Sequence, residues 1–124
     1  MTVHLDTSAL IHACSGRRSG LSTIAELVQA RARLEISALV WYEWRRGPRT
    51  ADDLELQGRL LPTAEIRPFG PAEAEIAARL YAEVRRPRGR DIDLAIAASA
   101  LAQGAHLWTL NRADFEDIPG LRLV

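Results

Sequence analysis

Residues 89–115, GRDIDLAIAASALAQGAHLWTLNRADF, decide the fold that the sequence predicts. The stretch enters an apolar helix through Asp91 and Asp93, turns at Gly104, and forms a short strand over residues 106–109. It ends in a polar segment that carries Asn111 and Asp114. Acidic groups therefore stand at both ends of one helix–strand unit. Because open α/β sheets place their sites at the edge where strands end and helices begin, this segment is a candidate for one half of an acidic, metal-holding pocket.

Two distant segments offer the other half. Residues 2–5 are apolar and partly β-branched, which predicts a first strand with Asp6 at its carboxyl end. Glu43 lies in LVWYEWRRG, residues 39–47, whose apolar side chains predict a largely buried helix. A carboxylate in such a helix needs a cation, a proton or hydrogen bonds. Three separate segments thus each place an acid beside an apolar element.

Composition limits the class of protein. A length of 124 residues suits one domain, so we expect a single domain over residues 1–124. The chain is 48% hydrophobic and 26% charged, and no apolar run approaches the roughly 20 residues that cross a bilayer. The single cysteine, Cys14, excludes an intrachain disulfide, and no targeting segment is visible. We therefore expect a cytoplasmic protein that does not act at a membrane.

The basic residues are 16 arginines, and they are clustered although the formal net charge is zero. The planar fork of arginine suits phosphate oxygens, and two clusters lie beside Glu43 and the start of the apolar helix. A basic rim around an acidic centre suits a polyanion held by its backbone, although pairing of these arginines with nearby acids is an equally good interpretation. The candidates for backbone contacts are Arg45, Arg46, Arg88 and Arg90.

Strand-like and helix-like segments alternate along the chain. Strands are predicted over residues 2–5, 34–37, 65–69, 106–109 and 121–124. Helices are predicted over residues 8–14 and 20–33, around Glu43, over residues 50–61, from Gly70-Pro71 and from Asp91; Val28 and Tyr81 belong to their expected inward faces. This alternation predicts an α/β fold with three layers, α/β/α, around a central, mostly parallel sheet of roughly five strands.

Each acid also has a purely structural interpretation. Asp91 is placed to cap the buried helix, and Asp6 to begin a turn or cap the next helix. Asp93 differs, because it lies among apolar residues where desolvation favours a ligand role. Converging carboxylates suit a hard dication such as Mg²⁺ or Mn²⁺, which can activate water for phosphodiester hydrolysis. Without a metal the same acids would repel one another or take up protons.

The sequence resembles the PIN-domain ribonucleases, and among them the VapC-type toxins of type II toxin–antitoxin systems. The resemblance rests on LDTSAL at 5–10, YEW at 42–44 and DLAIAASALAQGAHLWTLNRADF at 93–115, in the order and approximate spacing of the family's motifs. It covers essentially the whole chain and implies a PIN-like fold. The resemblance implies that the metal-binding and catalytic acids are Asp6, Glu43, Asp93 and Asp114, with Thr7, Ser8, Thr109 and Asn111 supporting them.

The resemblance further implies an endoribonuclease that depends on Mg²⁺ or Mn²⁺ and cleaves RNA. It implies a homodimer, and a toxin that inhibits translation and growth until a cognate VapB-type antitoxin binds it. The alternative is a catalytically degenerate PIN module that acts only as a binding partner. Receiver domains and haloacid-dehalogenase-like phosphatases also use strand-terminal aspartates, but both require a lysine near the phosphoryl group and the chain contains none.

Overall fold

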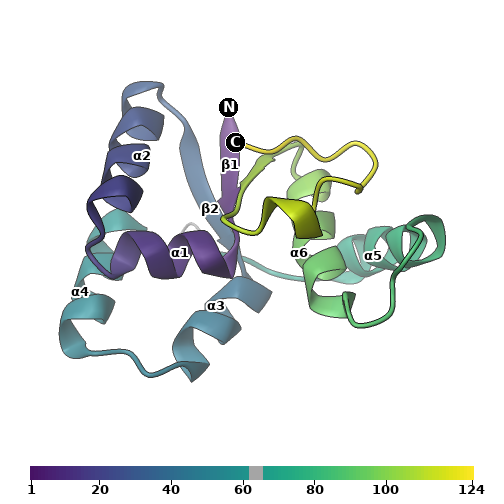
Figure 1. The fold of residues 1–124 in the computed structure, drawn as a ribbon, viewed down its shortest axis with the longest axis horizontal. Coiled ribbons are helices and arrows are strands. Elements are labelled where there is room, and N and C mark those ends of the chain that lie inside the picture. Colours follow the sequence, from purple (N-terminus) through teal and green to yellow (C-terminus); the bar gives the residue numbers. More distant parts are fainter. Residues whose placement is uncertain (62–65) are drawn as a thin grey trace.

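A computed structural model describes residues 1–61 and 66–124 of the chain. The strands are β1 (Thr2–Leu5), β2 (Arg33–Ser37), β3 (Ile66–Arg67) and β4 (His106–Trp108) (Figure 1). The helices are α1 (Thr7–Cys14), α2 (Arg18–Gln29), α3 (Ala38–Arg46), α4 (Ala51–Leu60), α5 (Pro71–Glu83) and α6 (Asp91–Ala102), followed by the short 3₁₀ helix η2 (Arg112–Asp114). The predicted alternation of strands and helices is confirmed from β1 to β4.

The sheet has the strand order β3-β2-β1-β4, and its described strand pairs are all parallel. β1 pairs with β4 so that Leu5 lies opposite Trp108, which aligns the carboxyl ends of these two strands. The predicted last strand, residues 121–124, is reduced to a single parallel bridge between Leu107 and Leu123. The sheet is therefore parallel, as predicted, with four strands and one additional bridge.

Helices cover both faces of the sheet. In Figure 1, α1, α2 and α4 lie on one side, and α5 and α6 lie together on the other. Every residue of α6 from Leu94 to Ala100 is buried, as expected for a helix without a polar face. The three-layer α/β/α architecture is confirmed. No helix within residues 1–61 and 66–124 combines the length and the apolar character needed to span a membrane.

α2 is shorter at its carboxyl end than predicted. It runs from Arg18 to Gln29 instead of over residues 20–33, because Arg31 adopts the left-handed conformation with φ 57° and turns the chain towards β2. Val28, predicted to face inward, is exposed. The predicted strand over residues 65–69 likewise shortens to β3 in the described part of the chain, and Glu65 lies outside the described residues.

α3 buries only one face, so the prediction of a largely buried helix is wrong. Val40 and Trp44, four residues apart, are buried, whereas Tyr42 on the opposite side is 61% exposed. Tyr81 of α5, predicted to face inward, is 43% exposed. Counting aromatic side chains overestimated burial, because an aromatic ring on the solvent side of a helix still counts as apolar in the sequence.

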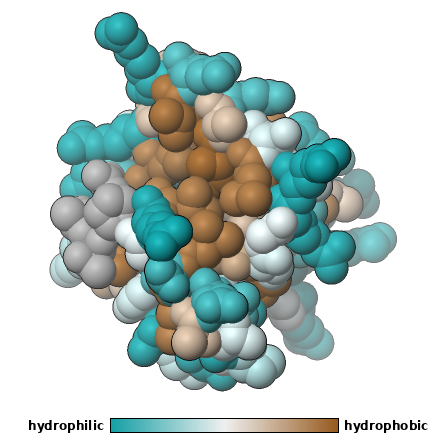
Figure 2. Space-filling view, turned by 90° about the vertical axis from the view of Figure 1, so that its left-hand side faces the viewer, coloured by the Kyte–Doolittle hydropathy of each residue, from teal (hydrophilic) through white to brown (hydrophobic). Residues whose placement is uncertain are grey.

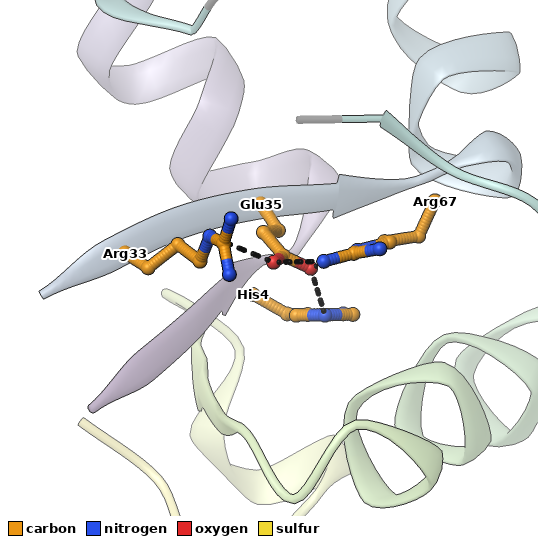
Figure 3. Close-up of polar contacts among 4 residues, drawn as sticks. All are labelled: His4, Arg33, Glu35 and Arg67. Carbon is orange, nitrogen blue, oxygen red and sulfur yellow. Dashed lines mark hydrogen bonds and ion pairs between the residues drawn. The ribbon is translucent and has the colours of Figure 1, made fainter. Parts of the chain in front are cut away.

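A buried polar cluster crosses the first three strands of the sheet (Figure 3). Arg67 of β3 donates two hydrogen bonds to the Glu35 carboxylate, from Nε to Oε2 at 2.5 Å and from Nη2 to Oε1 at 2.8 Å. His4 lies beside Glu35 with Nε2 3.4 Å from Oε2, and this nitrogen has no hydrogen-bond partner among the described residues. The Arg67 hydrogen bonds hold the pKa of Glu35 below its usual value, and burial lowers the pKa of His4 more than the Glu35 charge raises it. The cluster therefore contains a charged ion pair beside a neutral imidazole.

Candidate active site

Four acidic side chains lie around one edge of the sheet. Asp6 follows β1, Asp93 lies in the first turn of α6, and Asp114 ends η2 after β4. Glu43 lies in α3, which begins directly after β2 and is capped by the Ser37 hydroxyl. Because β2, β1 and β4 are adjacent and parallel, the segments that follow them emerge at the same edge.

Asp6 is held by hydroxyl groups. Its Oδ2 accepts hydrogen bonds from Thr109 Oγ1 at 2.8 Å and from Ser8 Oγ at 2.9 Å, and its backbone N–H donates to the carbonyl of Trp108 at 2.9 Å. Asp6 occupies the N-cap position of α1, but its side chain makes no capping hydrogen bond. The carboxylate is therefore oriented by the neighbouring strand end and is not used as a helix cap.

The two hydroxyls are themselves oriented by the backbone. Ser8 Oγ accepts from the N–H of Leu110, and Thr109 Oγ1 accepts from the N–H of Asn111, both at 3.0 Å. A hydroxyl that accepts on one side can direct its single hydrogen to another acceptor. Both hydroxyls are thus set to donate to Asp6, and the loop after β4 is fastened to the start of α1.

Glu43 is tied to the same region by Thr7. Thr7 Oγ1 donates to Glu43 Oε1 at 2.6 Å, and Arg46 Nη2 lies 3.5 Å from Glu43 Oε2. Because Thr7 is next to Asp6, this hydrogen bond connects the start of α1 with α3. The hydroxyl and the guanidinium approach different oxygens of the Glu43 carboxylate.

Arg90 fastens the η2 turn to the start of α6. Its Nη1 and Nη2 donate to Oδ2 and Oδ1 of Asp117 at 2.9 and 2.6 Å, and Nη2 also donates to the backbone carbonyl of Asp114 at 2.9 Å. These hydrogen bonds lower the pKa of Asp117 and raise the pKa of Arg90. Asp114 is thereby held beside the helix start that carries Asp93.

The N-cap prediction for Asp91 is wrong. Arg90 occupies the cap position of α6 without a side-chain capping bond, and Asp91 is the first helical residue, with an exposed side chain. The Arg90 guanidinium instead donates hydrogen bonds to Asp117 and to the Asp114 carbonyl, so a long-range contact fixes the segment before α6. The negative charge of Asp91 still lies at the favourable end of the helix dipole.

The pKa of Asp93 reflects the proximity of the other three acids. Its pKa is raised from 3.8 to about 6, first by burial and then by the charges of Asp6, Asp114 and Glu43, which Arg90 only partly offsets. A carboxyl surrounded by three carboxylates holds its proton because ionisation would add a fourth negative charge. The sequence-based expectation that these acids repel one another or take up protons agrees with this environment. The four acids form one electrostatic unit.

These acids do not form a closed ligand cage in the present conformation. Within the described residues, no group of three or more His, Cys, Asp and Glu side chains is arranged to hold a metal ion. The donor set nevertheless fits a hard dication, because it consists of carboxylate oxygens and carries mutual repulsion that a cation would relieve. The carboxylates of Asp6, Glu43 and Asp114 are thus near enough to Asp93 for their charges to raise its pKa.

The sequence model of the PIN domain family matches residues 3–121. The chain belongs to the PIN domain family. PIN domains are generally nucleases and generally bind divalent metal ions. No curated protein sequence matches the chain.

Solved structures agree with this assignment of the PIN domain. VapBC-1 from nontypeable Haemophilus influenzae is 26% identical with a TM-score of 0.72, covering 100% of this chain and 97% of that one. A toxin–antitoxin complex from Klebsiella pneumoniae is 27% identical with a TM-score of 0.67, covering 96% and 94%. VapBC2 from Rickettsia felis, bound to a DNA fragment from their promoter, has a TM-score of 0.80 at 24% identity, covering 100% and 98%, and shows the same fold.

The PIN domain brings most of the predicted site residues together. Thr7, Ser8 and Thr109 contact the acids directly, whereas Asn111 contributes its backbone N–H and has an exposed side chain. Four arginines are predicted to contact the RNA backbone. Arg46 approaches Glu43, and Arg90 is bound to Asp117. Arg45 and Arg88 are exposed.

Sequence reasoning missed one residue of the PIN domain site. Asp117 had no predicted role, yet it binds Arg90 through both carboxylate oxygens across 27 positions of sequence. Its only sequence signal is an acid shortly after NRADF, within the turn that also contains Asp114. A surface hollow lined by His12, Arg17, Arg18, Ser19 and Ser22 contains none of the four acids.

Proposed function

We propose that this PIN domain is a metal-dependent endoribonuclease and the toxin of a VapBC-type toxin–antitoxin pair. The observation that carries the proposal is the environment of Asp93, whose pKa is raised by burial and by three further carboxylates from separate segments. Such an arrangement destabilises the metal-free chain and is explained by a function that needs concentrated negative charge. The likeness to VapBC-1 and to the Klebsiella pneumoniae complex supports the toxin assignment.

In this proposal Asp6, Glu43, Asp93 and Asp114 hold Mg²⁺ or Mn²⁺. The bound ion would supply a water of lowered pKa and neutralise charge on the phosphoryl oxygens. Thr109 and Ser8 orient the Asp6 carboxylate, and Thr7 orients Glu43, so that the ligands are arranged before the substrate arrives.

The remaining polar groups favour a polyanionic substrate. Arg45, Arg46 and Arg88 are exposed on the segments that flank the acids and can meet RNA phosphates. Arg90 is already engaged by Asp117, so we assign it the positioning of Asp114 in preference to a direct RNA contact. The hydrolysis products would carry a 5′-phosphate or a 3′-phosphate according to which phosphoester oxygen leaves.

The proposed protein partner is a VapB-type antitoxin. The face formed by α1, α2 and α4 has a broad apolar area framed by hydrophilic side chains (Figure 2). Helices on this side carry the exposed Val28 and the partly buried Ile11, Leu54 and Leu60. A contiguous apolar area of this kind marks a protein interface. We propose that an apolar antitoxin segment covers it, and that the toxin is a cytoplasmic homodimer formed from one domain per chain.

The test is cleavage of a mixed RNA pool by purified protein free of antitoxin, in Mg²⁺, in Mn²⁺ and in chelator. Asp93→Asn removes the charge of the central acid, and Asp91→Asn is the matched control, because Asp91 is exposed two residues away in the same helical turn. We expect cleavage by the wild type and by Asp91→Asn in either metal, and none by Asp93→Asn or in chelator. Equal cleavage by the wild type and Asp93→Asn would contradict the proposal.

A second candidate function is a PIN module that binds its partner without cleaving RNA. The absence of a ready-made metal cage among the described residues favours this alternative. Calorimetric titration with Mn²⁺ separates the two candidates. A nuclease requires metal binding that Asp93→Asn weakens, whereas a degenerate module would bind no metal and still form a complex with the antitoxin.

A further inference from the structure

Exposed apolar residues are direct sequence neighbours of residues of the acidic site. The large hydrophobic residues that are exposed in the described part of the chain are Met1, Val28, Tyr42, Tyr81, Ile92, Leu110 and Val124. Three of these seven are direct sequence neighbours of site residues: Tyr42 precedes Glu43, Ile92 precedes Asp93, and Leu110 follows Thr109. Solvent-facing apolar groups beside a charged site call for a ligand that has both apolar and charged parts.

Tyr42 has the most specific surroundings of the three. The Arg46 guanidinium lies over the Tyr42 ring at 5.5 Å from its centroid, and Nη2 of the same arginine lies 3.5 Å from Glu43 Oε2. Arg46 therefore connects an exposed aromatic ring with a carboxylate of the acidic site. Tyr42 as a whole remains 61% exposed despite this contact, so its side chain is accessible to a planar ligand.

A second arginine–aromatic pair, four residues apart like the first, lies one position earlier in α3. Arg45 lies 5.6 Å from the centroid of the Trp41 ring, and Trp41 is partly buried. The solvent side of α3 thus combines flat rings with two exposed guanidinium groups. Two copies of this surface facing each other would bring Arg45 and Arg46 of both chains together, at an electrostatic cost. A polyanion with flat bases satisfies both the charge and the rings.

We infer that Tyr42 is a base-stacking residue that holds one unpaired nucleobase of RNA beside the phosphodiester to be cleaved, with Arg46 contacting the adjacent phosphate. The inference rests on the proposed nuclease function and deepens it. Aromatic side chains stack on every base type, and the base faces are accessible only where RNA is single-stranded. Tyr42 would therefore select unpaired nucleotides and fix the position of the cut, while the acids perform the chemistry.

Binding is the direct test, and Asp93→Asn protein is used so that RNA is not consumed. The probe is a single-stranded oligouridylate on the order of ten nucleotides long, with one 2-aminopurine whose fluorescence reports stacking. Tyr42→Ala is expected to weaken binding by roughly 5- to 150-fold and to lose the fluorescence change, because one base stack is removed. Tyr42→Phe keeps the ring and should bind as the parent does. Tyr81→Ala, which removes another exposed tyrosine far along α5, is the matched control and should have no effect.

The outcomes separate this inference from the proposed function and from a dimer contact. Unchanged binding by Tyr42→Ala would overturn the inference, even if the wild type cleaves RNA. A loss of binding that follows dissociation of a dimer, measured by light scattering on the same samples, would overturn it in favour of a contact between two copies. Tyr42-dependent base stacking in a protein whose wild type cleaves no RNA would refute the nuclease function, and with it the role of Tyr42 in placing the cut, and would leave Tyr42 as an RNA-binding residue only.

Discussion

Thr109 Oγ1 lies 2.8 Å from Asp6 Oδ2, and this buried hydrogen bond joins residues 103 positions apart in the sequence. Asp6 and Thr109 each follow a strand, β1 and β4, and these two strands are neighbours that pair in parallel. The pairing of β1 with β4 brings the two side chains together. The hydrogen bond then orients Asp6, which is a proposed metal ligand. It also makes Thr109 the most informative supporting residue.

Thr109→Val should damage the site more than the fold. The variant keeps the shape of the side chain and removes the hydroxyl that orients Asp6, so we expect RNA cleavage to fall about tenfold or more. Thr109→Ser retains the hydroxyl and should keep most of the activity. Steady-state cleavage rates and chemical unfolding of the three proteins test this. Equal activity in Thr109→Val and the wild type would show that Ser8 alone orients Asp6.

Asp93→Asn should stabilise the metal-free protein. The pKa of Asp93 is raised from 3.8 to about 6, so the folded state binds more protons than the unfolded state between these values and wild-type stability falls as pH rises through this window. After discounting for partial exposure, we expect the variant to gain about 1 kcal/mol above pH 6 and almost nothing near pH 4. Urea unfolding in chelator at both pH values measures the difference.

In the presence of metal, the wild type should be more stable than Asp93→Asn, the reverse of the order expected without metal. Mg²⁺ or Mn²⁺ that binds the folded state stabilises it by mass action, and Asp93→Asn should lose most of this gain. Asp91→Asn, with an exposed side chain in the same turn, should behave as the wild type does with and without metal. A stabilising effect of Asp91→Asn as large as that of Asp93→Asn would show that general charge reduction, and not the four-acid unit, is responsible.

The local periodicity of the sequence was sufficient to predict the elements that carry the site. The apolar run from Leu94 to Ala100 indicates a buried helix, and the short strands that precede Asp6 and Thr109 follow from β-branched and apolar residues bounded by polar ones. The parallel sheet followed from the alternation of these elements. The grouping of the acids then required only that parallel strands end at one edge.

Two features were harder to predict: which distant side chains pair with each other, and which face of a helix is buried. The sequence does not show that Arg90 binds Asp117, because local patterns carry no signal across 27 positions and arginines near acids have many possible partners. The apolar run at residues 39–44 predicts a largely buried helix around Glu43, whereas the α3 periodicity leaves Tyr42 on the exposed side, opposite Val40 and Trp44. The polar cluster inside the sheet was also not predicted, since Glu35 and Arg67 meet only when β2 and β3 pair.

Asp117→Asn should displace Asp114, because Arg90 links the two residues. The change removes the charge that holds both terminal nitrogens of Arg90, and Arg90 also donates to the Asp114 carbonyl. Because the pair lies largely at the surface, we expect a loss of stability of only about 0.5–1 kcal/mol. A displaced ligand should affect catalysis more strongly, with weaker Mn²⁺ binding and cleavage reduced about tenfold. Calorimetric titration with Mn²⁺ measures the first effect; Glu116→Gln, an exposed neighbouring acid, is the control.

The Glu35–Arg67 pair and His4 should make the fold sensitive to acid. Arg67 hydrogen bonds lower the pKa of Glu35 from 4.5, and burial lowers the pKa of His4 from 6.5. In both cases the unfolded state binds more protons than the folded state below the ordinary pKa, so stability is lost as pH falls, first below about 6.5 and again below about 4.5. Stability is best measured in the Asp93→Asn variant, because Asp93 in the wild type makes stability rise as pH falls and would mask this loss.

Variants of the cluster separate the two steps of this pH dependence. His4→Phe should abolish the decline that begins below about pH 6.5 and leave the one that begins below about pH 4.5, whereas His12→Gln, a change in a histidine on α1 outside the cluster, should leave both. Glu35→Gln should cost about 2 kcal/mol at pH 7, because it removes a charged acceptor of two Arg67 hydrogen bonds. Thermal unfolding across this pH range gives both results. If His4→Phe kept the upper decline, the protonation responsible would belong to another group, and the pKa of His4 would not be lowered in the folded state.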